Sequence, residues 1–285
     1  MASVILSGLF LGSLYALIAS GLTLIWGTLR MFNFAHGTFM MVGAYVAWTL
    51  SVNSAHLPLL VGAVIALAAT FVVGMVLELA IVAPFLRRPD AVLVVMITTL
   101  AASLALESGG QAIWGPQLAV LPSLASGSVT LFGVSTPWQN VLLMLLAPAV
   151  LLGIEQYFRR SRFGLAVRAV EQNREGATLV GVDVRRVYMV AFGLGAALAA
   201  LAGVVFGAIP FMSPTMGDDP LIKAFVVVVL AGLGNIGGTL ASAYVVGLLE
   251  AFLTYAVGLY WAPALIFVFM ALVLVVRPQG LFGEA

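Results

Sequence analysis

Three carboxylates lie within long apolar stretches of the sequence, and they are the first candidates for chemistry. Glu78, Glu107 and Glu250 are the acids nearest to the middle of such stretches. Ionisable groups at membrane depth are costly to bury, and they commonly mark a transport path or a proton relay. Glu250 is the most deeply placed, so it is the best candidate for a group that changes charge in a proton-coupled cycle. The sequence alone assigns it no role.

Other kinds of chemistry lack the residues that they need. The absence of cysteine excludes disulfides, thiolate catalysis and cysteine-ligated metals. His36 and His56, the only two histidines, leave little for a metal site. The chain has no His-x-x-x-His pair and no Gly-x-x-x-x-Gly-Lys-[Ser/Thr] phosphate loop. We therefore expect no enzyme activity, and no metal or cofactor in this chain.

The elements that hold these residues are predicted to be membrane-spanning helices. Of the 285 residues, 63% are hydrophobic and only 8% are charged, which is too few charges for a water-facing surface. Apolar runs of about 20 residues recur, each long enough to cross a bilayer as a helix. No long basic tract indicates a nucleic-acid partner. The predicted fold is all-α: a polytopic transmembrane bundle in a lipid bilayer, forming one domain over residues 1–285.

We expect eight or nine spans, including short or broken helices. The run 221–233 is too short to cross the membrane upright, so it is either a tilted short helix or a half-helix ending inside the membrane. Nine crossings, or eight with a re-entrant segment, both remain open. The apolar runs cover 4–29, 33–52, 57–83, 91–114, 138–157, 187–209, 221–233, 239–258 and 261–276.

The arginines predict the orientation, because cytoplasmic loops collect Lys and Arg. Arg30, the pair at 87–88, the cluster at 159–186 and Arg277 are all expected inside the cell. The loop with Asp218 and Asp219 is expected outside. Together these assignments place the N-terminus outside and the C-terminus in the cytoplasm.

The longest charged segment, residues 159–186, is predicted to form short amphipathic helices along the cytoplasmic face. Polar residues at 168, 171, 172, 175 and 178 follow the spacing of one helical face. Gly164 and Gly181 bracket the segment, as glycine does where helices end. The alternative is a solvated loop that only fixes the orientation.

A short repeat marks two predicted helix starts. Residues 33–39, with Tyr45 beyond them, resemble residues 235–240, with Tyr244 beyond. In transporters built from two related halves, broken helices meet near the substrate, although so short a match also arises by chance. We place the substrate pathway or its gate at Asn33, His36, Gly37, Thr98, Asn235, Gly237 and Gly238.

These residues also have structural interpretations. Asn33 and Asn235 are preferred types for helix N-caps. His36 could face solvent at the cytoplasmic rim. The Thr98 hydroxyl could bond to its own helix.

Several motifs, in order, resemble LivH-type permeases of branched-chain amino acid importers. They are residues 21–27 (GLTLIWG), 33–37 (NFAHG), 43–46 (GAYV), 162–164 (RFG), 223–230 (KAFVVVVL) and 232–238 (GLGNIGG). Residues 175–181 (EGATLVG) have the Glu-x-Ala-x-x-x-Gly spacing of the coupling loop in permeases of the ATP-binding-cassette class. Gly176 stands where that loop normally has its first alanine. The resemblance covers essentially the full length.

The resemblance implies a pore-forming permease subunit in a bacterial inner membrane, taking up branched-chain or other hydrophobic amino acids. Relatives also carry urea, short amides and aromatic acids, so the substrate stays open. The implied partners are a second LivM-like permease, two cytoplasmic ATPases that hold ATP and Mg²⁺, and an external or periplasmic substrate-binding protein. The ATPase-coupling residues would be Arg168, Glu171, Glu175, Gly176, Ala177 and Gly181. The alternative function is a stand-alone secondary transporter or channel for a small polar metabolite such as urea or a short amide.

Overall fold

The protein is a bundle of helices, as expected from its apolar runs. The computed structural model describes residues 1–209 and 211–283. Within these residues, six helices are long and apolar enough to cross a membrane, counting α3 with its extension to Phe85, and α11 is a shorter apolar helix. The predicted all-α polytopic fold is confirmed, and two further short helices, α2 and α9, complete the bundle. The elements are α1 Ala2–Leu29, α2 His36–Trp48, a π-helical turn η1 Thr49–Asn53, α3 Leu59–Leu77, a π-helical turn η2 Glu78–Val82, a 3₁₀ turn η3 Ala83–Phe85, α4 Ala91–Trp114, β1 Ser128–Leu131, β2 Val134–Pro137, α5 Trp138–Arg160, α6 Arg162–Gln172, α7 Arg174–Leu179, α8 Val184–Phe206, α9 Asp218–Ala231, α10 Ile236–Val257 and α11 Ala262–Val276.

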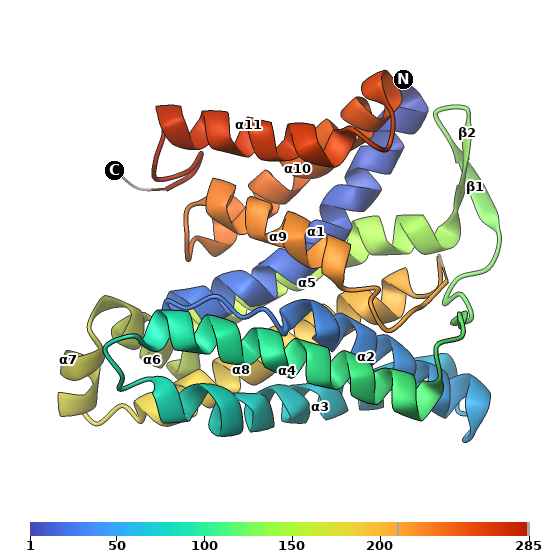
Figure 1. The fold of residues 1–285 in the computed structure, drawn as a ribbon. Helices are drawn as coiled ribbons and strands as arrows, with labels where there is room; N and C mark the ends of the chain where they lie inside the picture. Colours follow the sequence, from blue (N-terminus) through green and yellow to red (C-terminus); the bar gives the residue numbers. More distant parts are fainter. Residues whose placement is uncertain (210, 284–285) are drawn as a thin grey trace.

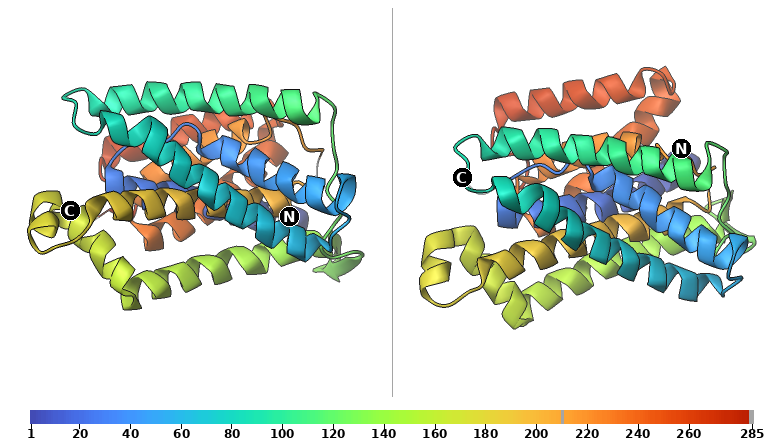
Figure 2. Two further views of the ribbon diagram at one scale, coloured as in Figure 1. Left: turned by 90° about the horizontal axis from the view of Figure 1, so that it is seen from below. Right: turned by 60° about the horizontal axis from the view of Figure 1, so that its bottom comes forward.

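The long helices run in roughly the same direction, and α1 crosses between them at an angle (Figure 1). The short helices α6 and α7 lie at one end of the bundle, and the hairpin of β1 and β2 lies at the other (Figures 1 and 2). The hairpin turns at Phe132 and Gly133, which both have positive φ, as a two-residue hairpin turn of type I′ requires. The N-terminus lies at the hairpin end (Figure 1).

Helix α1 is the centre of the packing, and it contacts α5, α8, α9 and α10. Its small residues allow the close approach of α10: a Cβ added at Gly247 would collide with the backbone of Gly12, and one added at Gly8 would lie 2.8 Å from the Cα of Leu248. Stripes of small residues bring helix backbones together in this way within membranes. Gly8 and Gly12 of α1 therefore serve packing within this chain.

Helix α2 begins inside the bundle and not at its end. The ring of His36 and the backbone of Gly195 both lie beside Gly21, which is within α1. Thr38, in the first turn of α2, hydrogen-bonds Ser103 near the middle of α4. The preceding residues re-enter the bundle as an irregular stretch, where the Phe34 N–H donates to Thr99 Oγ1 over 3.2 Å. The expected span over 33–52 is thus a half-helix that starts near mid-bundle.

Helix α9 begins at the same level, directly against α2. A Cβ added at Gly37 would lie 2.6 Å from the carbonyl oxygen of Gly217, and one added at Gly217 would collide with the backbone of Gly37. The short run 221–233 was expected to be a tilted helix or a half-helix ending in the membrane. It is a half-helix that starts there, and Asp218 and Asp219 form its first turn. The expectation that these two acids lie in a loop at the outer end is therefore wrong.

The charges are distributed unevenly between the two ends. Of the twelve Lys and Arg residues, eleven are arginines, and Lys223 is the only lysine. Seven of the eleven arginines lie within residues 159–186, in α6 and α7 or at the adjoining ends of α5 and α8. Lys223 lies within α9, where its Nζ contacts Glu250.

The contact between α2 and α9 predicts the effect of adding one methyl group. Gly217 has φ −88°, which alanine adopts without strain, so Gly217→Ala tests only the collision with the Gly37 backbone. Overpacking typically costs about 1–3 kcal/mol, and the obstacle here is main chain. We expect a clearly lower unfolding temperature for the purified chain in detergent.

The matched control is Gly153→Ala in α5, where an added Cβ meets nothing within 4 Å. This change should be neutral or slightly stabilising, because alanine is favoured in a helix by about 0.5–1 kcal/mol. Equal unfolding temperatures for the two variants would show that α2 and α9 do not touch at Gly217.

Candidate functional site

A polar cluster lies where α2 meets α4. The Ser103 hydroxyl donates to Glu107 Oε1 over 2.9 Å, Thr38 Oγ1 donates to the same oxygen over 3.2 Å, and the two hydroxyl groups also contact each other. Glu107 is near enough to Asp218 of α9 for their negative charges to interact. The two half-helix starts are therefore lined by hydroxyl and carboxylate groups.

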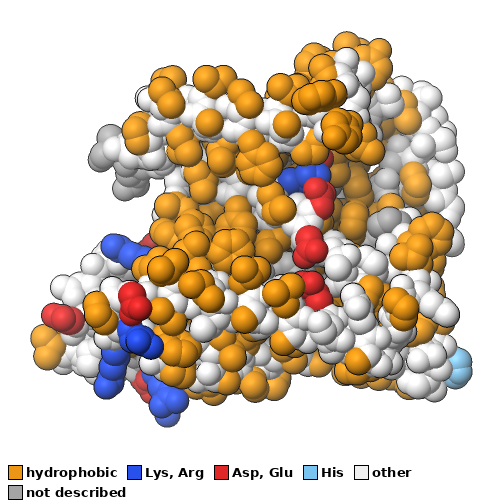
Figure 3. All heavy atoms as spheres, viewed as in Figure 1, with side chains coloured by type: hydrophobic (Ala, Val, Ile, Leu, Met, Phe, Trp, Pro, Cys, Tyr) orange, Lys and Arg blue, Asp and Glu red, His pale blue; other side chains and the backbone are white. Residues whose placement is uncertain are grey.

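From Glu107 and Asp218 the charges continue into Asp219 and Lys223 of α9, and these four side chains are the polar row. Figure 3 shows acidic and basic side chains gathered in a hollow between apolar surfaces. Helix α4 has exposed apolar side chains, among them Leu100 and Leu104 with exposed fractions of 48% and 58%. A charged row exposed to lipid is costly, so this face requires cover from protein or a water-filled passage.

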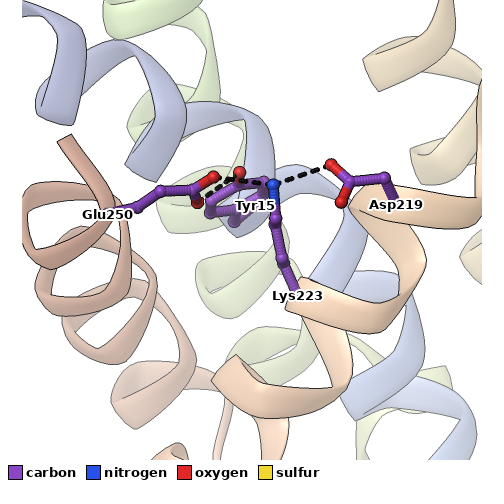
Figure 4. A network of polar contacts seen from close by, with 4 residues as sticks. All are labelled: Tyr15, Asp219, Lys223 and Glu250. Atoms are coloured by element: carbon purple, nitrogen blue, oxygen red, sulfur yellow. Dashed lines mark hydrogen bonds and ion pairs between the residues drawn. The ribbon is translucent and has the colours of Figure 1, made fainter. Parts of the chain in front are cut away.

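Lys223 joins two helices through a buried ion pair (Figure 4). Its Nζ lies 2.6 Å from Glu250 Oε1 and 2.7 Å from Asp219 Oδ2. The Tyr15 hydroxyl donates to the second oxygen of Glu250 over 2.6 Å. Glu250, which the sequence left without a role, thus accepts hydrogen bonds from α1 and α9. Its charge is balanced by Lys223, and a cycle of protonation would have to break that pair.

The pathway residues predicted at the start of α2 are buried. Asn33 is 1% exposed, and its Oδ1 accepts from the N–H of Ala35 over 3.0 Å. The N-cap of α2 is Ala35, so the capping role expected for Asn33 is wrong. His36 is fully buried, and its Nε2 lies 3.0 Å from the carbonyl oxygen of Ile18. The expectation that His36 faces solvent at the rim is therefore also wrong.

The remaining predicted pathway residues lie in α4 and at the start of α10. The Thr98 hydroxyl donates to the carbonyl of Val94 on its own helix, which confirms the structural interpretation. Asn235 is the N-cap of α10, where its Oδ1 accepts from the Gly238 N–H over 2.9 Å. Its Nδ2 donates to the Phe282 carbonyl over 2.8 Å. Gly237 faces only the Asn235 side chain, whereas Gly238 is packed against the Ala231 carbonyl.

The charged segment forms two short capped helices, as the polar spacing predicted. Ser161 caps α6 and Asn173 caps α7, each accepting from a backbone N–H over 2.9 Å. Arg168 is tied to the end of α5, because its Nη1 donates to the Phe158 carbonyl over 2.6 Å. Gly181 has φ +85°, a conformation that glycine adopts readily, and it ends the segment.

The tip of α7 presents apolar side chains outward. Leu179 is 88% exposed and Val180 is 78% exposed, whereas Ala177 is buried within this chain. Glu175 is also exposed, and Gly176 is half-buried beside Asn173. Exposed leucine and valine at the arginine-rich end mark a surface that a protein partner can cover. The spacing of polar residues indicated the helices, but it did not single out this apolar tip.

Glu171 connects α6 to the ends of two spans. A Cβ added at Gly27 of α1 would lie 3.4 Å from Glu171 Oε1, and one added at Gly234 would lie 3.2 Å from the same atom. Arg30 donates from Nη2 to the Glu171 carbonyl over 3.2 Å. Burial raises the pKa of the Glu171 carboxyl above its usual range, and the positive charge of Arg30 opposes part of that rise. The Glu171 side chain thus lies in a notch formed by two glycines.

The described part of the chain offers no metal site, since no three His, Cys, Asp or Glu side chains are grouped there. The cluster between α2 and α4 and the network around Lys223 contain carboxylates, hydroxyls and one lysine. In the polar row and beside it, Glu107 accepts from Thr38 of α2, and Glu250 accepts from Tyr15 of α1 and Lys223 of α9. Such contacts between helices suit a lining surface for a passage more than a catalytic centre.

Comparison with known proteins gives full-length matches. A family model described as "Branched-chain amino acid transport system / permease component" matches residues 4–276. The permease LivH of Escherichia coli (strain K12) is 30% identical over 291 residues, covering 98% of this chain and 94% of the relative. BraD of Pseudomonas aeruginosa is 30% identical over 293 residues, covering 98% and 95%. A probable LivH of Methanocaldococcus jannaschii is 31% identical over 294 residues, covering 95% and 89%.

These relatives are named as permease proteins of branched-chain amino acid transport systems. The matches run through the half-helices, the charged segment and the central ion pair alike. This chain belongs to the family of branched-chain amino acid transport permeases, and it is a multi-pass permease subunit of an ATP-binding-cassette importer and not an enzyme.

Proposed function

We propose that this chain forms one half of a membrane passage for branched-chain amino acids, driven by partner ATPases. The observation that carries the proposal is the exposed apolar tip of α7 at the arginine-rich end, in a chain without a phosphate loop. The partners are a LivM-like permease, two cytoplasmic ATPases holding ATP and Mg²⁺, and an external substrate-binding protein. The names of the relatives support the substrate class.

The passage follows the polar row, and the second permease closes it. Gly37 and Gly217, which are both buried, form its narrow centre, because their missing side chains let the starts of α2 and α9 touch there. Asn33 and His36 fix the start of α2, through the Ala35 N–H and the Ile18 carbonyl of α1 respectively. Thr98 belongs to the α4 wall, and Asn235, Gly237 and Gly238 belong to the inner gate, where the C-terminal segment packs.

The N-terminus lies outside and the C-terminus inside the inner membrane. The gathering of seven arginines within residues 159–186 supports this orientation. The chain is free of cysteine, so single cysteines at Ser126 and Gln172 report the two sides. A membrane-impermeant thiol reagent added to intact cells should label Ser126→Cys and spare Gln172→Cys; the reverse pattern would invert the topology.

Docking of α7 on an ATPase predicts that Leu179→Asp disrupts the complex. Burying one leucine contributes about 1.5–3 kcal/mol, so the affinity of the ATPase for the permeases should fall at least about tenfold. Glu175→Lys should also weaken docking, because it reverses a charge at the same surface. Both side chains are exposed, so the chain itself should fold normally.

The control is Leu118→Asp, which changes a leucine that is 61% exposed outside α7. ATPase binding to reconstituted permeases and leucine uptake into the same liposomes are measured for each variant. If Leu179→Asp and Glu175→Lys both bind the ATPase and transport like the unmodified protein, α7 is only an orientation signal.

Glu171 predicts a separate effect, on coupling and not on docking. Movement of α6 and α7 reaches the ends of α1 and α9 through the Glu171 side chain between Gly27 and Gly234. Glu171→Ala should therefore leave ATPase binding intact while uptake per ATP hydrolysed falls about tenfold, within the usual range of coupling free energies.

Gln172→Ala provides the matched control, since Gln172 is the next residue on α6 and is exposed. It should leave uptake per ATP unchanged. Equal coupling ratios in the two variants would remove Glu171 from the path of transmission.

A further inference from the structure

One buried carboxylate has no partner among the described residues. Glu78 has no exposed surface, and neither of its side-chain oxygens accepts a hydrogen bond. It begins the π-helical turn η2 that continues α3, and such turns often occur at functional sites. A carboxylate without a partner is costly to bury, so this position favours a ligand that supplies a donor.

Glu78 lines a cavity of about 520 Å³ between η2, α7 and α8, with Arg87, Arg174, Arg185 and Tyr188 around it. Arg185 acts on Glu78 through its charge, but the two make no ion pair within 4.0 Å. Arg174 lies over the Tyr188 ring at 5.4 Å. The cavity thus combines one buried anion with three cationic side chains.

The other acid of this cavity is already neutralised. Asp183 lies 2.9 Å from Arg186 Nε, and it also accepts from the Arg186 N–H at the start of α8. Among the ion pairs of the described residues, none involves Arg87, Arg174 or Arg185. The cavity therefore offers acceptors for a cation at Glu78 and donors for an anion at the arginines.

The position of the cavity favours a membrane component as its occupant. Val72 and Val76, spaced by one helical turn on α3, are 52% and 57% exposed, and they form an apolar stripe that leads toward η2. Leu79 and Ala83 continue the chain into the wall of the cavity. Basic pockets at the cytoplasmic side of membrane helices are suited to lipid headgroups.

We propose that this cavity binds a ligand with a primary ammonium next to an anionic group, supplied by an aminophospholipid headgroup. The ammonium donates to the two free oxygens of Glu78. The phosphate is held by Arg174 and Arg185, and the acyl chains lie along Val72 and Val76. A free amino acid has the same pair of charges, and it is the alternative source.

The test measures lipid binding to the purified importer complex by native mass spectrometry. The probes are phosphatidylethanolamine, phosphatidylcholine, whose quaternary ammonium has no N–H, and phosphatidylglycerol, which has no ammonium. We expect phosphatidylethanolamine to bind about tenfold more tightly than phosphatidylcholine, as a hydrogen bond to a charged group allows. Glu78→Gln should abolish this preference, and Arg174→Gln should weaken the binding of phosphatidylethanolamine and phosphatidylglycerol alike.

Glu155→Gln is the control, because Glu155 pairs with Arg159 on α5 outside this cavity; it should bind each lipid like the unmodified complex. Arg174 is exposed, so its variant keeps the test valid if Glu78→Gln folds poorly. The proposal is overturned if phosphatidylethanolamine and phosphatidylcholine bind equally, or if the preference survives Glu78→Gln. Binding of L-leucine, but not of phosphatidylethanolamine, in a Glu78-dependent manner would overturn the lipid source and support the ammonium site.

Discussion

The backbones of Gly37 and Gly217 touch inside the bundle, and this contact allows two helices to begin there. Lipid cannot hydrogen-bond a free backbone N–H, so irregular chain at membrane depth is tolerated only where protein or water covers it. The Thr99 hydroxyl accepts from the Phe34 N–H, and Asn33 Oδ1 accepts from the Ala35 N–H. Asp218 and Asp219 occupy the first turn of α9, where negative charge is favoured by the helix dipole.

The rest of the bundle holds this pair of half-helices in place. Lys223 ties α9 to α10 through Glu250, and Tyr15 adds α1 to the same buried network. Buried ion pairs need well-placed hydrogen bonds to offset their desolvation, and Glu250 receives one on each oxygen. From α1, the connection continues through Gly27 to Glu171 on α6, next to the exposed α7. A continuous set of contacts therefore joins the exposed surface of α7 to the centre of the bundle.

The sequence predicted the parts of the fold that depend on local composition. The span 91–114 matches α4 at both ends because Asp90 and Gly115 interrupt the apolar run. Polar spacing likewise predicted short helices within residues 159–186, where α6 and α7 lie. The sequence did not place the start of α2 inside the bundle. Asn33 and His36 look like polar residues of an exposed helix end, because their burial depends on contacts with α1, α4 and α8. The Lys223–Glu250 pair joins residues 27 apart in sequence, so no local pattern reveals it. The Glu78 oxygens lack hydrogen-bond partners because of the helices packed around them, which a local pattern also does not show.

We expect α6 to move rigidly with the ends of α1 and α9 that lie beside Glu171. Electron–electron distance measurements on spin labels in the reconstituted complex test this most directly, since the chain has no cysteine of its own. One pair joins Gln172 to Leu233, and a second pair joins Leu233 to Ser126 at the hairpin end. We predict that ATP leaves the first distance unchanged and alters the second, because α6 and the segment after α9 move as one body. A change in the first distance with no change in the second would contradict the account.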